Sequence, residues 1–393
     1  MNEPKLRFKA DDGSQFPDWE EHKIKEFVTE SNIFGHTGKE AKKLTVKLWA
    51  KGVVPKENIF SGSENTQYYI RHSGQLMYGK LDFLNCAFGI VPPELDGYES
   101  TFDAPAFDIH DISDKFLLSY ITRKSFYKKN GDIANGSRKA KRIHPAVFGE
   151  MSIMVPSPPE QQKIAEFLST IDTVIEKQKE TVSAWEERKK GVMQTLFSQE
   201  VRFKADDGSE FPEWEEKKLG DVFAERIERS KGGESLLSVT LLQGIVKQSE
   251  TYKRNIASEN KSNYKIVKKN DLAYNTMRMW QGAEGVSDYD GIVSPAYTVI
   301  TALDGNNSYF FETLFKQTFM LHVFQRYSQG LTSDTWNLKF PAFSEIKLLL
   351  PCEDEQNKIV ECVAALDEVI EKQKATLAAW EELKKGLLQQ MFI

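Results

Sequence analysis

VPSPPEQQKIAEFLSTIDTVIEKQKETVSAWEERKKGVMQTLF occupies residues 155–197, and LPCEDEQNKIVECVAALDEVIEKQKATLAAWEELKKGLLQQMF occupies residues 350–392. The two stretches lie 195 positions apart (350 − 155), and more than half of their aligned positions are identical. No proline follows Glu160 in the first stretch, whereas Pro156 and Pro158 precede it, as is typical of a helix start. Each stretch is therefore predicted to form one helix of about 37 residues, roughly 55 Å long at about 1.5 Å per residue.

Apolar residues recur in alternating steps of four and three residues along both predicted helices, which is the period of a coiled-coil seam. A glutamine occupies the same seam position in both copies, and such a polar residue fixes the register of paired helices at some cost in stability. The alternative is two separate surface helices, each lying on its own domain, with a 3.6-residue period and a wider apolar stripe. The alternating steps of four and three residues favour the paired seam. Its predicted residues are Ile164, Leu168, Ile171, Ile175, Gln178, Val182 and Trp185 in the first copy, and Ile359, Val363, Leu366, Ile370, Gln373, Leu377 and Trp380 in the second.

The duplication extends through the whole chain of 393 residues. RFKADDGSQFPDWEE (7–21) returns as RFKADDGSEFPEWEE (202–216), again 195 positions later (202 − 7). Identity mostly vanishes in residues 25–154 and 220–349, where only faint echoes remain. Unconstrained sequence divergence is one explanation, but such divergence would also have lowered the identity between the two helical stretches. We therefore interpret the pattern as one scaffold that has kept its framework while its loops diverged in function.

Chain connectivity predicts that the two long helices run antiparallel. The second globular segment starts where the first helix ends and finishes just before the second helix begins, so the second helix must start where the first one finishes. The repeated fifteen-residue segment is then the junction between a helix end and a globular domain, with Trp19 and Trp214 packed there. The expected fold class is α+β, with two similar globular domains separated by an antiparallel two-helix coiled coil in a pseudo-two-fold internal duplication. The expected limits are 1–155 and 199–350 for the globular domains, and 156–198 and 351–393 for the helices.

Composition narrows the class of protein. No run of about 18 apolar residues occurs, and the first residues are polar, so we expect neither a membrane span nor a secretory signal. The three cysteines offer no zinc spacing and no disulfide framework, which fits the reducing cytoplasm. The net charge of −6 argues mildly against nucleic-acid binding, although a total does not show how charge is distributed.

Two domains held at a fixed spacing suit a long, regular, charged ligand, and duplex DNA is the obvious candidate. The segments GSRKAKRIH (136–144) and NKSNYKIVKKND (260–271) carry basic clusters that suit phosphates, although a solvated surface loop explains them equally well. YNTMRMWQG (274–282) carries side chains that pair with adenine or guanine edges, and its tryptophan could stack on bases or simply pack. The candidate DNA-contacting residues are Lys80, Ser137, Arg138, Lys139, Lys141, Arg142, Lys265, Lys268, Asn275, Arg278, Trp280, Gln281, Thr335 and Trp336.

No catalytic motif emerges from the sequence. It contains no Asn/Asp-Pro-Pro-aromatic motif of the kind that amino-methyltransferases use, and no glycine-rich cofactor loop follows an apolar strand. The six histidines are scattered without metal spacing, so no metal site is expected. We expect a binding protein rather than an enzyme.

Taken together, these motifs resemble the DNA-specificity subunit of type I restriction–modification systems, over essentially the whole chain. The resemblance rests on the proline-then-Glu-Gln helix starts, the KKG…Q…F helix ends, the RF…DDG..FP.W junctions and the phrase LAYNTMRMWQGAEG…GIVSPAYTVI. It implies two target-recognition domains, each binding one half of a bipartite, asymmetric DNA site, and helices that set the spacer. The first globular domain departs from this phrase, because it has no counterpart of Asn275, Arg278 and Trp280.

The resemblance also implies partners. The paired helices would dock two methyltransferase subunits, which methylate adenine with S-adenosylmethionine, and motor-nuclease subunits would complete the restriction enzyme. S-adenosylmethionine, ATP and magnesium would then act in those partners, with no cofactor bound by this chain. Two alternatives remain: a self-standing DNA-binding regulator, and a coiled-coil scaffold with protein-binding domains. A third, a self-contained restriction–modification enzyme, is disfavoured by the missing catalytic motifs.

Overall fold

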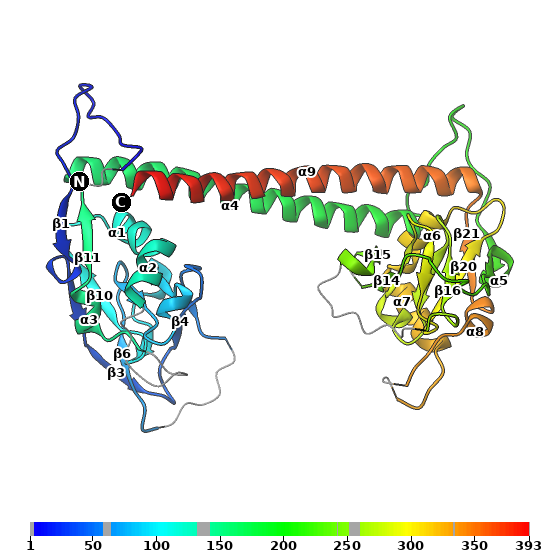
Figure 1. Cartoon of the computed structure of the whole chain (residues 1–393), viewed down its shortest axis with the longest axis horizontal. Helices are drawn as coiled ribbons and strands as arrows, with labels where there is room; N and C mark the ends of the chain where they lie inside the picture. The colour runs from blue at the N-terminus through cyan, green and yellow to red at the C-terminus, as the bar shows by residue number, and fades with distance from the viewer. Residues whose placement is uncertain are drawn as a thin grey trace. The chain divides into compact units, whose positions relative to one another are not determined.

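Figure 1 shows the computed structural model of the chain, which describes residues 4–57, 64–131, 142–241, 243–250, 260–332 and 335–392. The chain divides into two compact units. The first comprises Met1–Thr181 and Gln373–Ile393, and the second comprises Val182–Lys372. Each unit therefore contains one globular domain and part of both long helices. The domain limits expected from the sequence, which treat each helix as a separate segment, stay a prediction.

A four-stranded antiparallel sheet in the order β2-β10-β7-β8 forms the centre of the first unit. Smaller sheets pair β1 with β11, β6 with β3 and β9, and β4 with β5. The strands are β1 (Glu20–Lys23), β2 (Val28–Ser31), β3 (Phe34–Thr37), β4 (Leu44–Val46), β5 (Val53–Pro55), β6 (Gln67–Ile70), β7 (Leu76–Tyr78), β8 (Phe88–Ile90), β9 (Glu99–Thr101), β10 (Ala106–Ile109) and β11 (Ser152–Val155). The helices are η1 (Ile24–Glu26), η2 (Phe83–Asn85), η3 (Pro93–Leu95), α1 (Asp114–Ile121), α2 (Lys124–Gly131) and α3 (Pro145–Gly149).

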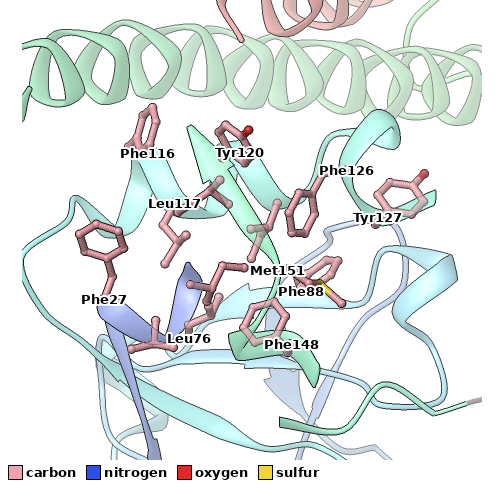
Figure 2. Close-up of a cluster of buried hydrophobic side chains, with 14 of the residues drawn as sticks. Phe27, Leu76, Phe88, Phe116, Leu117, Tyr120, Phe126, Tyr127, Phe148 and Met151 are labelled. Atoms are coloured by element: carbon pink, nitrogen blue, oxygen red, sulfur yellow. The ribbon is translucent and has the colours of Figure 1, made fainter. Parts of the chain in front are cut away.

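Aromatic side chains fill the core of the first unit. The ring of Tyr78 on the central strand β7 lies 4.8 Å from that of Phe148 and stacks at 5.9 Å on that of Phe107. Offset and edge-to-face pairs of this kind are the arrangements that ring quadrupoles favour. Figure 2 shows Phe116 and Tyr120 of α1 in the same cluster. The core therefore joins the sheet to the helices that cover it.

The second unit repeats this architecture, with a central antiparallel sheet in the order β13-β20-β17-β18. Smaller sheets pair β12 with β21, β14 with β15 and β16 with β19. The strands are β12 (Glu215–Lys218), β13 (Phe223–Glu225), β14 (Leu237–Thr240), β15 (Gly244–Lys247), β16 (Lys265–Val267), β17 (Leu272–Asn275), β18 (Glu284–Val286), β19 (Gly291–Val293), β20 (Tyr297–Ala302) and β21 (Lys347–Leu350). The helices are α5 (Leu219–Val222), η4 (Gln248–Glu250), η5 (Met279–Gln281), α6 (Ser308–Phe315), α7 (Thr318–Tyr327) and α8 (Phe340–Ser344). The matching strand orders confirm two similar α+β domains.

The long helices α4 (Pro158–Phe197) and α9 (Glu353–Met391) pair in opposite directions, as predicted. In the first unit, the amide of Gln178 donates a hydrogen bond to Oε1 of Gln373 at 2.8 Å, and Asp172 pairs with Lys384. Residue numbers thus rise along α4 while they fall along α9. In the second unit, Lys189 donates to Asp367 at 2.6 Å. The two contacts in the first unit therefore show an antiparallel pair, and the contact in the second unit shows that the helices also meet there.

The predicted seam residues face away from solvent to different degrees. Buried side chains are those of Ile164, Leu168, Ile171, Ile175, Val182, Ile359, Val363 and Ile370. Half-buried side chains are those of Gln178, Trp185, Leu366, Gln373, Leu377 and Trp380. The seam residues near the start of each long helix also belong to a globular core. Ile164 and Leu168 of α4 lie in the core of the first unit, and Ile359 and Val363 of α9 lie in that of the second.

A buried carboxylate explains why the junction segment of the first unit contains Arg7 at its start and Trp19 near its end. The side chain of Glu160, on the first turn of α4, is fully buried. Nε and Nη2 of Arg7 donate to its two oxygens at 3.1 and 2.8 Å, and Nε1 of Trp19 donates to Oε2 at 3.2 Å. Burying a charge requires such pairing and hydrogen bonding. The junction segment is thus locked to the start of the helix.

The second unit contains the same lock. Arg202 donates to both oxygens of the buried Glu355 at 3.1 and 2.8 Å, and Trp214 donates to Oε2 at 3.1 Å. The prediction that Trp19 and Trp214 pack at the helix–domain junctions is therefore confirmed. The repeated fifteen-residue segment recurs because each long helix needs the same partner at its start.

The next glutamine attaches each long helix to a short one. Oε1 of Gln161 accepts a hydrogen bond from the backbone N–H of Ser113, the N-cap of α1, at 2.9 Å. Oε1 of Gln356 accepts one from Asn307, the N-cap of α6, also at 2.9 Å. Each amide also donates to the carbonyl of the proline that precedes the long helix. The Glu-Gln pair thus fixes the angle at which a globular domain meets its helix.

Candidate nucleic-acid interface

A short 3₁₀ turn, η5, joins the central strands β17 and β18 of the second unit. The chain leaves β17 at Asn275, whose Oδ1 accepts a hydrogen bond from the backbone N–H of Met277 at 3.0 Å. Gly282 closes the turn with a φ of 84°, in the left-handed region that favours glycine. Arg278 at the start of the turn is exposed, and Gln281 at its end is half-buried. Both side chains are placed where a ligand could reach them.

Two predicted tryptophans meet beside this turn. The rings of Trp280 and Trp336 lie edge to face with their centroids 5.3 Å apart. Nε1 of Trp280 donates to the carbonyl of Met277 at 3.1 Å, and the backbone N–H of Leu338 donates to the carbonyl of Thr276 at 2.8 Å. The structure therefore brings together two stretches that the sequence analysis assigned separately. Trp280 is half-buried and supports the turn by packing.

The loop that carries Trp336 is a narrow hairpin. Backbone hydrogen bonds of 2.9 and 2.8 Å join Gln329 and Asn337 in both directions. Oγ1 of Thr335 donates to the carbonyl of Thr332 at 2.9 Å, so this hydroxyl is used within the loop. Leu331 is fully exposed. Thr335 thus shapes the loop, and its side chain is already engaged.

The first unit has an equivalent turn, η2, between β7 and β8. Tyr78 pairs with Phe88 across the strands, just as Tyr274 pairs with Glu284 in the second unit. Cys86 closes η2 with a φ of 54°, at the position that glycine occupies in η5. The two turns are therefore copies of one structural element, as the faint resemblance of residues 74–83 to residues 270–280 predicts.

Lys80 requires a correction, because its side chain is fully buried and not at the surface. Its Nζ lies 3.0 Å from the centroid of the Phe102 ring and has no hydrogen-bond partner among the described residues. Burial lowers the pKa of the ammonium group, since a low-dielectric site disfavours its charged form. The sequence-based assignment of Lys80 to a surface DNA contact is therefore not supported. Lysine is almost never fully buried, so the local sequence carried no warning.

The remaining predicted basic residues that the structure describes lie in ion pairs. Lys265 contacts Glu225 at 3.3 Å, Lys268 contacts Asp290 at 3.1 Å, and Arg142 contacts Asp103 at 3.3 Å. The side chain of Lys265 is only 12% exposed, whereas half of that of Lys268 is exposed. Lys268 and Arg142 are thus better placed for phosphates than Lys265. The predicted contacts Ser137, Arg138, Lys139 and Lys141 lie outside the described residues.

Glu284 is a buried acid at the position where the first unit has Phe88. Neither of its carboxylate oxygens has a hydrogen-bond partner among the described residues, and Nζ of Lys316 is 3.8 Å away. Burial raises the pKa of Glu284 well above its ordinary value of 4.5. The proton is therefore held more tightly in the folded chain than in the unfolded chain, and stability falls as the pH rises above about 4.5.

Replacing Glu284 with leucine should stabilise the protein at neutral pH by about 1–4 kcal/mol, because an apolar side chain avoids the cost of a buried charge. In this variant Lys316 retains its ion pair with Glu312, whose Oε1 lies 2.8 Å from Nζ of Lys316. Urea unfolding at pH 4 and at pH 8 would measure the difference in the free energy of unfolding between the variant and the unaltered chain. This difference should be larger at pH 8. Glu312→Leu is the matched control, because that side chain is 23% exposed. Equal advantages at both pH values would contradict the prediction.

Two features are absent from the described residues. In that part of the chain, no group of three His, Cys, Asp or Glu side chains is placed to hold a metal ion. None of the helices found there is both long and apolar enough to cross a membrane.

Comparison with known proteins identifies the family. The sequence pattern of the type I restriction modification DNA specificity domain matches residues 106–183 and 212–379. The chain belongs to this family. Its fold is similar to that of a type I restriction-modification S subunit from M. genitalium, with a TM-score of 0.54 and 14% identity over 100% of this chain and 99% of the other. It is also similar to a chain from a structural study of complex assembly and conformational transition in the type I R-M system, with a TM-score of 0.56 and 15% identity over 96% and 98% of the two chains.

Proposed function

We propose that this specificity subunit reads a bipartite, asymmetric DNA site, with one half-site bound by each globular domain. The observation that carries the proposal is a contrast within the duplication. The two domains share their central sheets, their junction locks and their helix-capping glutamines, whereas the turns η2 and η5 carry different exposed side chains. Keeping a framework while changing its exposed turns is what two different half-sites would require.

The paired helices α4 and α9 are proposed to set the spacer between the half-sites and to dock two methyltransferase subunits. Their exposed faces are charged, and a coiled-coil seam gives each helix a stiffness that a loop lacks. Motor-nuclease subunits would join this assembly. S-adenosylmethionine, ATP and magnesium are proposed to act in those partners in the cytoplasm, while this chain contributes no catalytic group.

The test is to map methylated adenines genome-wide in cells that carry the chain and its methyltransferase partner. A split, asymmetric motif is expected. Insertion of one heptad into each long helix adds about 10 Å, at roughly 1.5 Å per residue, and should lengthen the unread spacer by about three base pairs. Both half-sites should stay the same. A heptad preserves the seam, whereas a four-residue insertion locally unwinds it, so the four-residue insertion is the control and should lower methylation.

Other results would favour the alternatives. A self-standing regulator should give tight, partner-free binding to a near-palindrome, and a protein-binding scaffold should give no footprint at all. A split footprint whose spacer length is unchanged by the heptad insertion would contradict the role proposed for the helices.

A further inference from the structure

The equivalent turns η5 and η2 each hold one hydrogen-bonded pair of side chains. In the second unit, Nη1 of Arg278 donates to Oε1 of Gln281 at 3.2 Å. In the first unit, Nδ2 of Asn85 donates to Oδ1 of Asp82 at 3.3 Å. The members of the two pairs lie 196 positions apart (278 − 82 and 281 − 85). The same offset relates the tyrosines that end the preceding strands, so the pairs occupy equivalent places (274 − 78).

The two pairs present opposite hydrogen-bonding groups. A guanidinium only donates, so Gln281 must turn its carbonyl oxygen towards Arg278 and keeps its NH₂ group for another partner. A carboxylate only accepts, so Asn85 must turn its NH₂ group towards Asp82 and keeps its carbonyl oxygen. The second unit therefore offers mainly donors at this turn, whereas the first unit offers mainly acceptors.

These groups are available to a ligand. Among the described residues, none of the four side chains makes a hydrogen bond outside its own pair. The neighbouring side chains of Leu81 and Met277, at equivalent positions in the two turns, are 43% and 45% exposed. Each polar pair thus lies on a turn that is open to solvent.

We propose that these pairs determine base specificity, an inference that rests on the function proposed above. The Arg278–Gln281 pair reads the acceptors O6 and N7 of a guanine in the major groove. The Asp82–Asn85 pair reads an exocyclic amino group there, either N4 of cytosine or N6 of adenine. Each pair acts on the half-site bound by its own domain.

Exchange of the pairs tests this directly. One variant carries Arg278→Asp with Gln281→Asn, and the other carries Asp82→Arg with Asn85→Gln. Each is produced as the full chain with its methyltransferase partner, and methylated sites are mapped genome-wide. One base pair should change in one half-site, while the other half-site and the spacer stay the same. Affinity for the original duplex should fall roughly 5- to 150-fold, as expected for loss of one bidentate base contact.

Leu81→Ala and Met277→Ala are the matched controls, because these neighbours on the same turns take no part in the pairs. Both should keep the original motif. The identity of the base pair that changes in the Asp82 variant shows whether cytosine or adenine supplies the amino group. An unchanged motif in both exchange variants would overturn the proposal, and so would loss of methylation at every site with an unchanged melting temperature.

Where an exchange lowers the melting temperature, the near-isosteric variants Asp82→Asn and Asn85→Asp decide the question in the first unit. Arg278→Gln and Gln281→Glu do so in the second. Relaxed specificity at one position supports the proposal, and an unchanged motif or uniform loss of methylation contradicts it. Failure of the proposed function looks different, because the unaltered chain would then give no split motif at all.

Discussion

Replacing Arg7 with alanine is expected to lower the free energy of unfolding by about 3–5 kcal/mol. The reason is the carboxylate of Glu160, which is fully buried and receives two hydrogen bonds from this guanidinium. Removing one partner of a buried pair leaves the other charge without compensation, and this costs more than the pair itself contributes. Urea unfolding followed by circular dichroism measures the change. The equivalent variant Arg202→Ala should show a loss of the same order, because its geometry at Glu355 is the same.

Two further variants separate charge from geometry. Arg7→Lys keeps the charge but cannot form the two-pronged contact with the carboxylate, so an intermediate loss is expected. Lys163→Ala breaks a neighbouring ion pair with Asp11, whose side chain is 95% exposed, and should cost about 0–1 kcal/mol. A loss below about 1 kcal/mol in the free energy of unfolding for both Arg7→Ala and Arg202→Ala would show that the buried carboxylates do not depend on these arginines.

The helices and junctions could be predicted because they are periodic and repeated. The 3.5-residue steps indicated a seam, chain connectivity required opposite directions, and the recurring Trp19 and Trp214 marked the junctions. The bidentate contact between Arg7 and Glu160 could not be predicted in the same way. It joins residues 153 positions apart (160 − 7), and only the folded chain brings them together.

The site was harder to predict, because its elements are short and their roles depend on tertiary contacts. Trp280 and Trp336 were assigned separately, and the sequence could not show that their rings touch. Lys80 looked like a surface cation, but an aromatic ring 22 positions further on covers it (102 − 80). The turn in the first unit did leave a signal. Aligning GQLMYGKLDF (74–83) with NDLAYNTMRMW (270–280) places Asp82 opposite Arg278. The alignment does not show that each of these residues forms a hydrogen bond with a side chain three positions later in the sequence.

Replacing Phe392 with alanine is the second change expected to have a large effect, with a loss of about 3–5 kcal/mol in the free energy of unfolding. The side chain is 5% exposed and packs in the core of the first unit. Its ring lies 5.6 Å from that of Phe116, 5.7 Å from that of Tyr120 and 6.1 Å from that of Trp19. The guanidinium of Arg123 also lies 4.8 Å from its centroid. Alanine would leave a cavity among these groups, and rings that pack on one another cannot easily close it.

The duplication supplies a matched control at Phe197, the equivalent position in the first repeat. This side chain is only half-buried, and its ring contact is with Phe310 at 5.9 Å. Phe197→Ala should therefore cost about half as much, because less apolar area returns to water and less of a cavity forms. Urea unfolding of both variants under the same conditions gives the comparison. A loss for Phe392→Ala no larger than that for Phe197→Ala would mean that ring packing at Phe392 does not stabilise the first unit, and that the junction there depends on the Arg7–Glu160 contact instead.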